Sequence, residues 1–144
     1  MAAVPVMPIR IQLLPEYVHV VWHGELVNQD LEFLSAEMPR IGRQIGRAPN
    51  VLHTFEEVTS TSLRFDAMHI HGNRLRSVKV PNSCRIASVC HQPVAFGMAR
   101  MMQLINQNPA LQMQVFTELE PALRWLKDAP ATPEKAPAAG QVPA

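Results

Sequence analysis

A chain of 144 residues, of which 47% are hydrophobic and 17% charged, is long enough to form one domain with its own core. The formal net charge of +1 argues against a protein that binds nucleic acid mainly by neutralising phosphates, and the apolar content argues against an acidic disordered chain. The apolar stretches are interrupted by His, Arg, Gly or Pro before they reach the ~18 residues of a membrane span.

The first elements that we expect are two short strands joined as a hairpin. Residues 1–8 are an extension without a basic leader, so we expect no signal peptide. Residues 9–14 form a short apolar run, and residues 17–23 alternate with a period of two, which is typical of a strand. The Pro15-Glu16 pair between them favours a turn.

A helix follows, with Asn28 as its predicted N-cap and Asp30 in its first turn. Apolar residues then recur at spacings of three and four, which predicts one buried stripe. Pro39 lies inside this segment, and we expect a break or kink near Met38 because proline removes an amide donor. Gly46 indicates the end of the helix.

The middle of the chain predicts two buried strands separated by a helix. Residues 51–55 form the first strand, and residues 59–62 supply cap candidates for a helix that starts at about residue 63. Gly72 is expected to weaken or end this helix. After a turn, residues 85–90 form the next strand.

The last elements are a helix, a strand and a final helix. Pro93 opens the first helix, and residues 111–116 alternate as a strand. Thr117 and Glu120 have the spacing of a capping box, which predicts the start of an amphipathic helix. From residue 129 to residue 144 the chain is mostly Ala and Pro, and we expect a disordered tail.

The resulting order is β-β-α-β-α-β-α-β-α. Such alternation predicts an α/β domain over residues 9–128, with a mixed, mostly parallel five-stranded sheet and about four helices. The first strand would form an antiparallel edge, and the order of strands within the sheet stays open.

Four segments carry a resemblance to a known family. Residues 17–31 join a strand to Gly-Glu-Leu-Val-Asn-Gln-Asp-Leu, residues 51–55 form a central strand, residues 85–89 read Arg-Ile-Ala-Ser-Val, and residues 115–126 end in Arg-Trp-Leu. In this order they resemble the SpoIIAA-like family, which is related to STAS domains. The resemblance implies a non-catalytic, cytoplasmic protein-interaction or regulatory domain with an unidentified protein partner, and a homodimer is one option.

The resemblance also raises an alternative function, a phosphorylation switch of the anti-sigma-factor-antagonist type. That subgroup carries its phosphorylated serine at a helix start, and the candidates here are Ser60, Thr61 and Ser62. Phosphate at a helix N-terminus would be electrostatically favourable. The turn lacks the Asp and Gly of that subgroup, and ordinary caps are the alternative.

No pattern in the chain predicts catalysis, a metal or a cofactor. His69 and His71 are two residues apart, so on a helix they point apart, and no C-x-x-C or H-E-x-x-H spacing occurs. We expect Cys84 and Cys90 to be reduced, inert and typical of a cytosolic protein. The sequence therefore predicts a protein that is not an enzyme.

Basic residues form two groups that could contact an anionic partner. Arg40, Arg43 and Arg47 make one helical stripe, and a second group lies between residues 74 and 79. Solvent-exposed helix faces are the alternative.

Methionine and phenylalanine residues suggest a second function, the binding of a small apolar ligand or lipid. Methionine adapts to irregular contacts, so these residues could line a pocket or be covered by a second copy of the chain, and core packing is the alternative. The candidates are Phe65, Phe96, Met98, Met101, Met102 and Met113.

Overall fold

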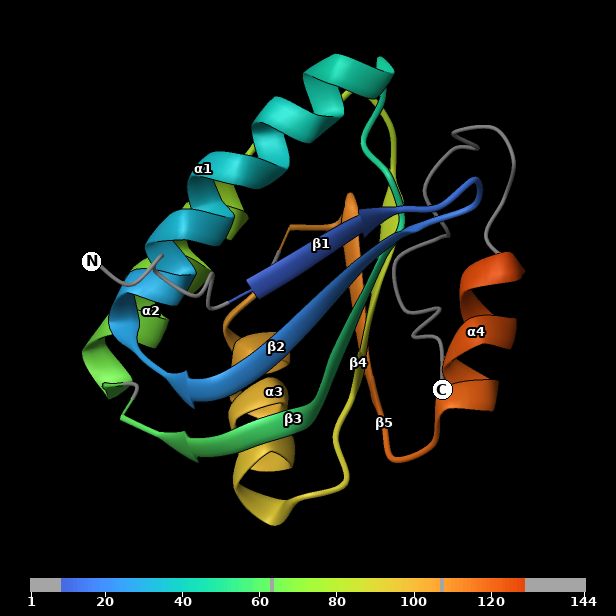
Figure 1. Cartoon of the computed structure of the whole chain (residues 1–144). Coiled ribbons are helices and arrows are strands. Elements are labelled where there is room, and N and C mark those ends of the chain that lie inside the picture. The colour runs from blue at the N-terminus through green and yellow to red at the C-terminus, as the bar shows by residue number, and fades with distance from the viewer. Residues whose placement is uncertain (1–8, 63, 107, 129–144) are drawn as a thin grey trace, which may run out of the picture.

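The computed structural model describes residues 9–62, 64–106 and 108–128, and the side chain of Phe65 is not among the described parts. The predicted N-terminal extension and C-terminal tail lie outside these residues. Within them, the element order is the predicted β-β-α-β-α-β-α-β-α (Figure 1).

The five strands follow one another across the sheet in the order of the chain. β1 pairs with β2 in an antiparallel hairpin, whereas β2, β3, β4 and β5 run parallel. The predicted mixed sheet is therefore confirmed. The strands are β1 (Ile9–Leu13), β2 (Val18–Leu26), β3 (Val51–Thr61), β4 (Cys84–Val89) and β5 (Leu111–Phe116).

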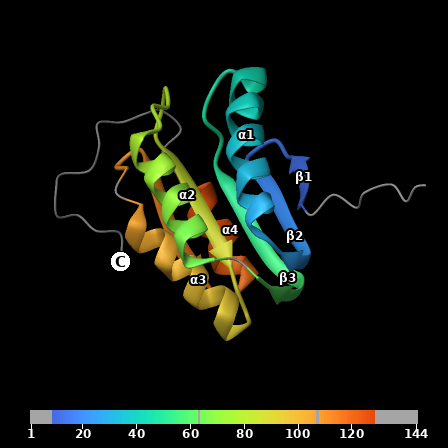
Figure 2. The same ribbon diagram turned by 90° about the vertical axis from the view of Figure 1, so that its left-hand side faces the viewer.

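The helices lie on both faces of this sheet. They are α1 (Asn28–Ile45), α2 (Phe65–Ser77), α3 (Pro93–Ile105) and α4 (Leu119–Lys127). Each of the first three connects two neighbouring parallel strands in the same direction, and right-handed connections therefore place all three on one face. Figure 2 shows α1, α2 and α3 as a layer in front of the sheet, with α4 behind it.

Each face has its own hydrophobic cluster, because side chains alternate along a strand. Val20, Trp22 and Val51 pack with apolar residues of α1, α2 and α3. Leu52 and Ala87 point the other way and pack with α4. We call the first side the helix layer face and the second the α4 face.

Of the expected break or kink near Met38, the break is wrong, because α1 continues through Pro39 to Ile45. Proline removes one helical hydrogen bond. Buried Leu31, Leu34 and Ile41 anchor α1 on both sides of Pro39, and this packing keeps the segment helical. The N-cap is Val27 rather than Asn28, whereas Asp30 does lie in the first turn and accepts a hydrogen bond from the Val27 amide at 2.9 Å.

The expected cap residues at 59–62 are also wrong, because β3 extends to Thr61. Glu25 pairs with Ser60 and Leu26 with Thr61, so the longer β2 supplies a partner for the end of β3. Helix α2 starts only at Phe65, after Arg64 as N-cap.

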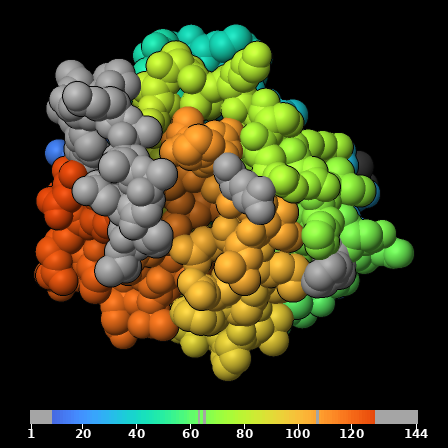
Figure 3. Space-filling model, turned by 180° about the vertical axis from the view of Figure 1, so that it is seen from behind, coloured from blue at the N-terminus to red at the C-terminus, as the bar shows by residue number. Residues whose placement is uncertain are grey.

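Gly72 does not end α2, which runs on to Ser77. Instead it lies where α2 meets α3, because a Cβ atom at this position would be 2.2 Å from Cγ2 of Ile105. The missing side chain lets the two helices approach closely. Figure 3 shows α2 and α3 side by side on this surface.

The predicted capping box at Thr117 is wrong as well. Helix α4 starts one residue later, with Glu118 as N-cap and no side-chain capping hydrogen bond. Pro121 then lies in the first helical turn, where its missing amide has no helical partner to lose.

Candidate functional site

A cavity of about 790 Å³ lies between the helix layer and the sheet. Its walls are mainly apolar and come from α1, α2, α3 and the strands that face them. Five methionines contribute: Met38, Met68, Met98, Met102 and Met113. The cavity therefore occupies the space in which a closely packed core would normally lie.

The cavity opens at one end of the molecule. All the exposed residues of its lining belong to the second half of α1, the last turn of α2, or the connections that follow these helices. They are Pro39, Arg43, Gly46, Arg47, Arg74, Val78, Lys79 and Pro81. We call this set the mouth.

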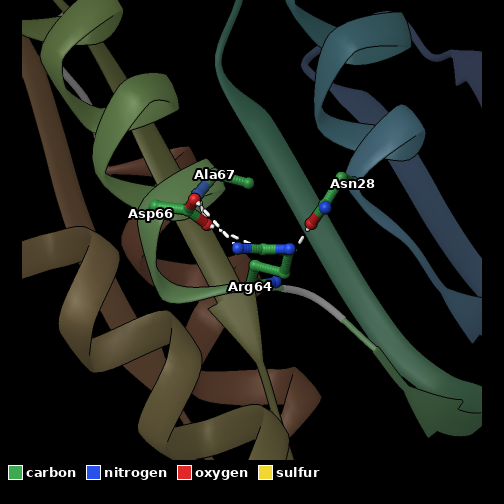
Figure 4. A network of polar contacts seen from close by, with 4 residues as sticks. All are labelled: Asn28, Arg64, Asp66 and Ala67. Carbon is green, nitrogen blue, oxygen red and sulfur yellow. Dashed lines mark hydrogen bonds and ion pairs between the residues drawn. The ribbon is translucent and has the colours of Figure 1, made fainter.

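The opposite ends of α1 and α2 are held together by polar contacts. The Arg64 amide donates to Oδ1 of Asn28 at 3.0 Å, and the Arg64 guanidinium pairs with Asp66 at 3.2 Å (Figure 4). The Ser62 amide donates to the Leu26 carbonyl at 2.8 Å. The contacts of Arg64 with Asn28 and of Ser62 with Leu26 join the starts of α1 and α2 at the end of the helix layer opposite the mouth.

Trp22 and His53 form the polar part of the sheet wall. Trp22 Nε1 donates to Nδ1 of His53 at 2.9 Å, so the neutral His53 ring carries its proton on Nε2. Phe55 stacks on Trp22 with ring centroids 5.6 Å apart. Burial, followed by the nearby charges of His71 and His19, lowers the pKa of His53 to about 3, so this ring is uncharged at neutral pH.

His71 and Ser35 form a second polar pair in the cavity wall, with Nδ1 and Oγ 2.9 Å apart. A serine next to a histidine is the arrangement of a nucleophile and its base. Burial, followed by the charge of Arg74, lowers the pKa of His71 to about 4, which makes it a weak base at neutral pH. Among the described residues no carboxylate contacts this ring, so the pair does not form a catalytic triad.

The structure places the apolar candidate residues in different surroundings. Met98, Met102 and Met113 line the cavity. Met101 packs against the core cluster of the helix layer without lining the cavity, and Phe96 is half-buried outside it. The Phe65 side chain is outside the described parts.

The predicted helical stripe of Arg40, Arg43 and Arg47 is incomplete, because α1 ends at Ile45 and Arg47 follows its C-cap Gly46. Arg43 and Arg47 belong to the cavity lining, whereas Arg40 does not and forms an ion pair with Glu37. From the second basic group, Arg74 and Lys79 also lie in the lining.

Ser60, Thr61 and Ser62 are exposed, but they precede the start of α2 at Phe65. They therefore do not occupy a helix N-terminus, and the expected placement of these hydroxyls at the start of a helix is wrong. Phosphorylation itself stays a prediction.

The two cysteines are free and buried. Burial raises the pKa of Cys84 to about 11 and that of Cys90 to about 12, so both are thiols at neutral pH. Cys84 lines the cavity near the mouth. Among the described residues, no group of three His, Cys, Asp or Glu side chains is arranged to hold a metal ion.

No family model and no curated protein matches the chain. A crystal structure of an uncharacterized protein of the DUF3478 family from Shewanella loihica PV-4, described as having a SpoIIAA-like fold, does match. The match covers 82% of this chain and 91% of that chain, with a TM-score of 0.50 and 18% sequence identity.

The fold is SpoIIAA-like. The predicted resemblance is therefore confirmed at the level of the fold. At 18% identity the likeness carries no information about ligands or partners. None of the helices in the described part of this SpoIIAA-like chain has the length and apolar character needed to cross a membrane.

Proposed function

We propose that this SpoIIAA-like domain is a non-catalytic module that binds a small apolar molecule in the cavity between the helix layer and the sheet. The observation that carries the proposal is the cavity itself, at about 790 Å³. Ligand pockets in proteins typically measure roughly 300–1,000 Å³ and are lined mainly by apolar side chains. Ordinary cores contain few voids larger than a water molecule.

The composition of the wall supports an apolar occupant. The flexible thioethers of the five methionines can adjust to ligands of different shape. Trp22 and Phe55 add a flat aromatic surface on the sheet side. A water-filled cavity of this kind would be unfavourable, because water finds few polar partners on such walls.

The reactive groups support binding rather than catalysis. The thiol of Cys84 is protonated at neutral pH, and His71 is too weak a base to activate Ser35. These groups instead give the cavity a few neutral hydrogen-bonding positions, which can fix the orientation of a ligand.

The regulatory role, a protein partner and a homodimer remain predictions that this proposal can accommodate. A ligand that fills the cavity would contact α1, α2 and α3 together, so occupancy could alter the surface that a partner meets. We also propose a cytoplasmic location, which the free Cys84 and Cys90 support.

Binding can be tested with a neutral fluorescent probe, N-phenyl-1-naphthylamine, and dodecanol as its competitor. We expect saturable probe fluorescence that dodecanol displaces. The variant Ala99→Trp should lose this binding, because Ala99 lies in the cavity wall and the indole would occupy the space.

The matched control is Ala36→Trp, which places the same side chain at an exposed position of α1 outside the lining. This variant should bind the probe as the unmodified protein does. Absence of saturable binding in the unmodified protein, or equal binding by both variants, would contradict the proposal.

A further inference from the structure

We infer that the cavity takes a single-chain anionic amphiphile, with the hydrocarbon chain inside and the acidic head group at the mouth between Arg43, Arg47 and Lys79. This inference rests on the proposed function and adds the chemical class and the orientation of the ligand.

The charges of the lining carry the inference. Four lining residues have a charged side chain, and all four are basic: Arg43, Arg47, Arg74 and Lys79. No Asp or Glu belongs to the lining within the described part of the chain. All four basic residues are also exposed and belong to the mouth, so positive charge gathers where the cavity meets solvent.

Three of these cations are available for a ligand. Arg74 pairs with Glu32 at 3.6 Å. Arg43, Arg47 and Lys79 have no acidic partner among the described residues, in contrast to Arg40, which pairs with Glu37 away from the lining. A carboxylate or phosphate at the mouth would provide the missing partner.

The ends of the surrounding helices account for only one of these three cations. Arg43 lies in the last turn of α1, where a cation complements the helix dipole. Arg47 lies beyond the C-cap Gly46, and Lys79 lies in the connection after α2. Because both helices direct their negative ends towards the mouth, any attraction for an anion must come from the basic side chains.

The interior fixes the direction of the ligand. The polar groups farther inside are uncharged, and they include the neutral rings of His53 and His71. An ionised head group would be poorly stabilised there, because burial of an unpaired charge costs far more than burial of hydrocarbon. The chain therefore enters first and the head group stays at the mouth.

The test compares three ligands with the same chain length: dodecanoate, dodecyl phosphate and dodecanol. Each is titrated against N-phenyl-1-naphthylamine bound to the unmodified protein, at concentrations below micelle formation. We expect at least one of the two anions to bind about tenfold more tightly than the alcohol, and raising the salt concentration to reduce this preference. The carboxylate and the phosphate separate a fatty-acid-like from a phospholipid-like head group.

The triple variant Arg43→Gln, Arg47→Gln, Lys79→Gln should lose the preference for the anion while its affinity for dodecanol stays unchanged. The matched control Arg40→Gln removes a cation from the same helix outside the mouth and should keep the preference. Equal binding of anions and alcohol by the unmodified protein, or an unchanged preference in the triple variant, would overturn the inference while the proposed function stands. Failure of all three ligands to displace the probe, or of the probe to bind, would overturn both.

Discussion

The two faces of the sheet differ in how closely the helices pack against the strands. On the α4 face, Ala87 and Ala122 are fully buried, and Leu52 is 1% exposed. The Arg85 guanidinium donates to the Trp125 carbonyl at 2.6 Å and lies 4.9 Å from the centre of its ring. Small residues thus allow α4 to lie close to the strands.

On the helix layer face, the strands present large side chains and the helices present methionines. Trp22, His53 and Phe55 stand on the sheet, and Met68, Met98 and Met102 face them from α2 and α3. The contact leaves a cavity of about 790 Å³. The difference indicates that the α4 face is closely packed, whereas the helix layer face leaves the space that we propose as a binding site.

The same substitution should destabilise the α4 face much more than the helix layer face. Ala122→Leu inserts three carbon atoms into a filled contact and should lower the free energy of unfolding by about 3 kcal/mol. Ala99→Leu, in α3, extends into the cavity and should change it by less than about 1 kcal/mol. Urea denaturation of both variants measures the difference.

An equal loss of stability in the two variants would show that the helix layer face is as closely packed as the α4 face. The comparison between the faces, and with it the reason for proposing a ligand, would then fail.

Acid should destabilise the protein through the helix layer face. The pKa of His53 is lowered to about 3 and that of His71 to about 4, whereas an unfolded histidine has a value near 6.5. Below pH 6.5 the unfolded state therefore binds more protons than the folded state, and stability falls as the pH drops towards 4. At pH 5 each histidine should account for a loss of about 2 kcal/mol relative to pH 7.

The variant His53→Phe should show a smaller loss between pH 7 and pH 5 than the unmodified protein, whatever its stability at pH 7. His91→Gln, at an exposed ring that pairs with Glu56 at 3.3 Å, is the control. Urea denaturation at both pH values is the measurement. An unchanged pH dependence in His53→Phe would contradict the attribution of the acid destabilisation to His53.

The contact between α2 and α3 is the one close approach that we expect to be sensitive within the helix layer. Gly72→Ala should lower the free energy of unfolding by about 1–2 kcal/mol, because the new Cβ would overlap Ile105. Gly97→Ala, on α3 with no atom within 4 Å of the added Cβ, should be neutral or stabilising.

Thermal denaturation distinguishes these variants. Combining Gly72→Ala with Ile105→Ala should cost less than the sum of the single changes, because the second change removes the overlapping methyl group. Additive losses would mean that the helices separate rather than clash.

The order of elements was predictable because each depends on local periodicity. Pro93 starts α3 and residues 111–116 form β5 as their sequence indicates. The end of β3 was not predictable, since Thr59 to Thr61 fit a cap or a strand equally well and pairing with β2 decides between them. The helix at Pro39 depends likewise on buried residues of other elements.

The site was predictable only by residue type. Methionines at 98, 102 and 113 and arginines at 43 and 47 were identified as candidates, and they line the cavity. The pairs Trp22–His53 and Ser35–His71 join residues 31 and 36 positions apart, which no local pattern shows. The signal that could have found Trp22 and His53 is alternation, which places both on the helix layer face of neighbouring strands.

The chain has two tryptophans, and the sheet separates them. Trp22 stands in the cavity wall, whereas Trp125 belongs to the cluster on the α4 face. In a Trp125→Phe variant, the remaining indole emission would report the environment of the cavity alone. The fluorescence of Trp22 can therefore be used to follow ligand binding in real time without any added label.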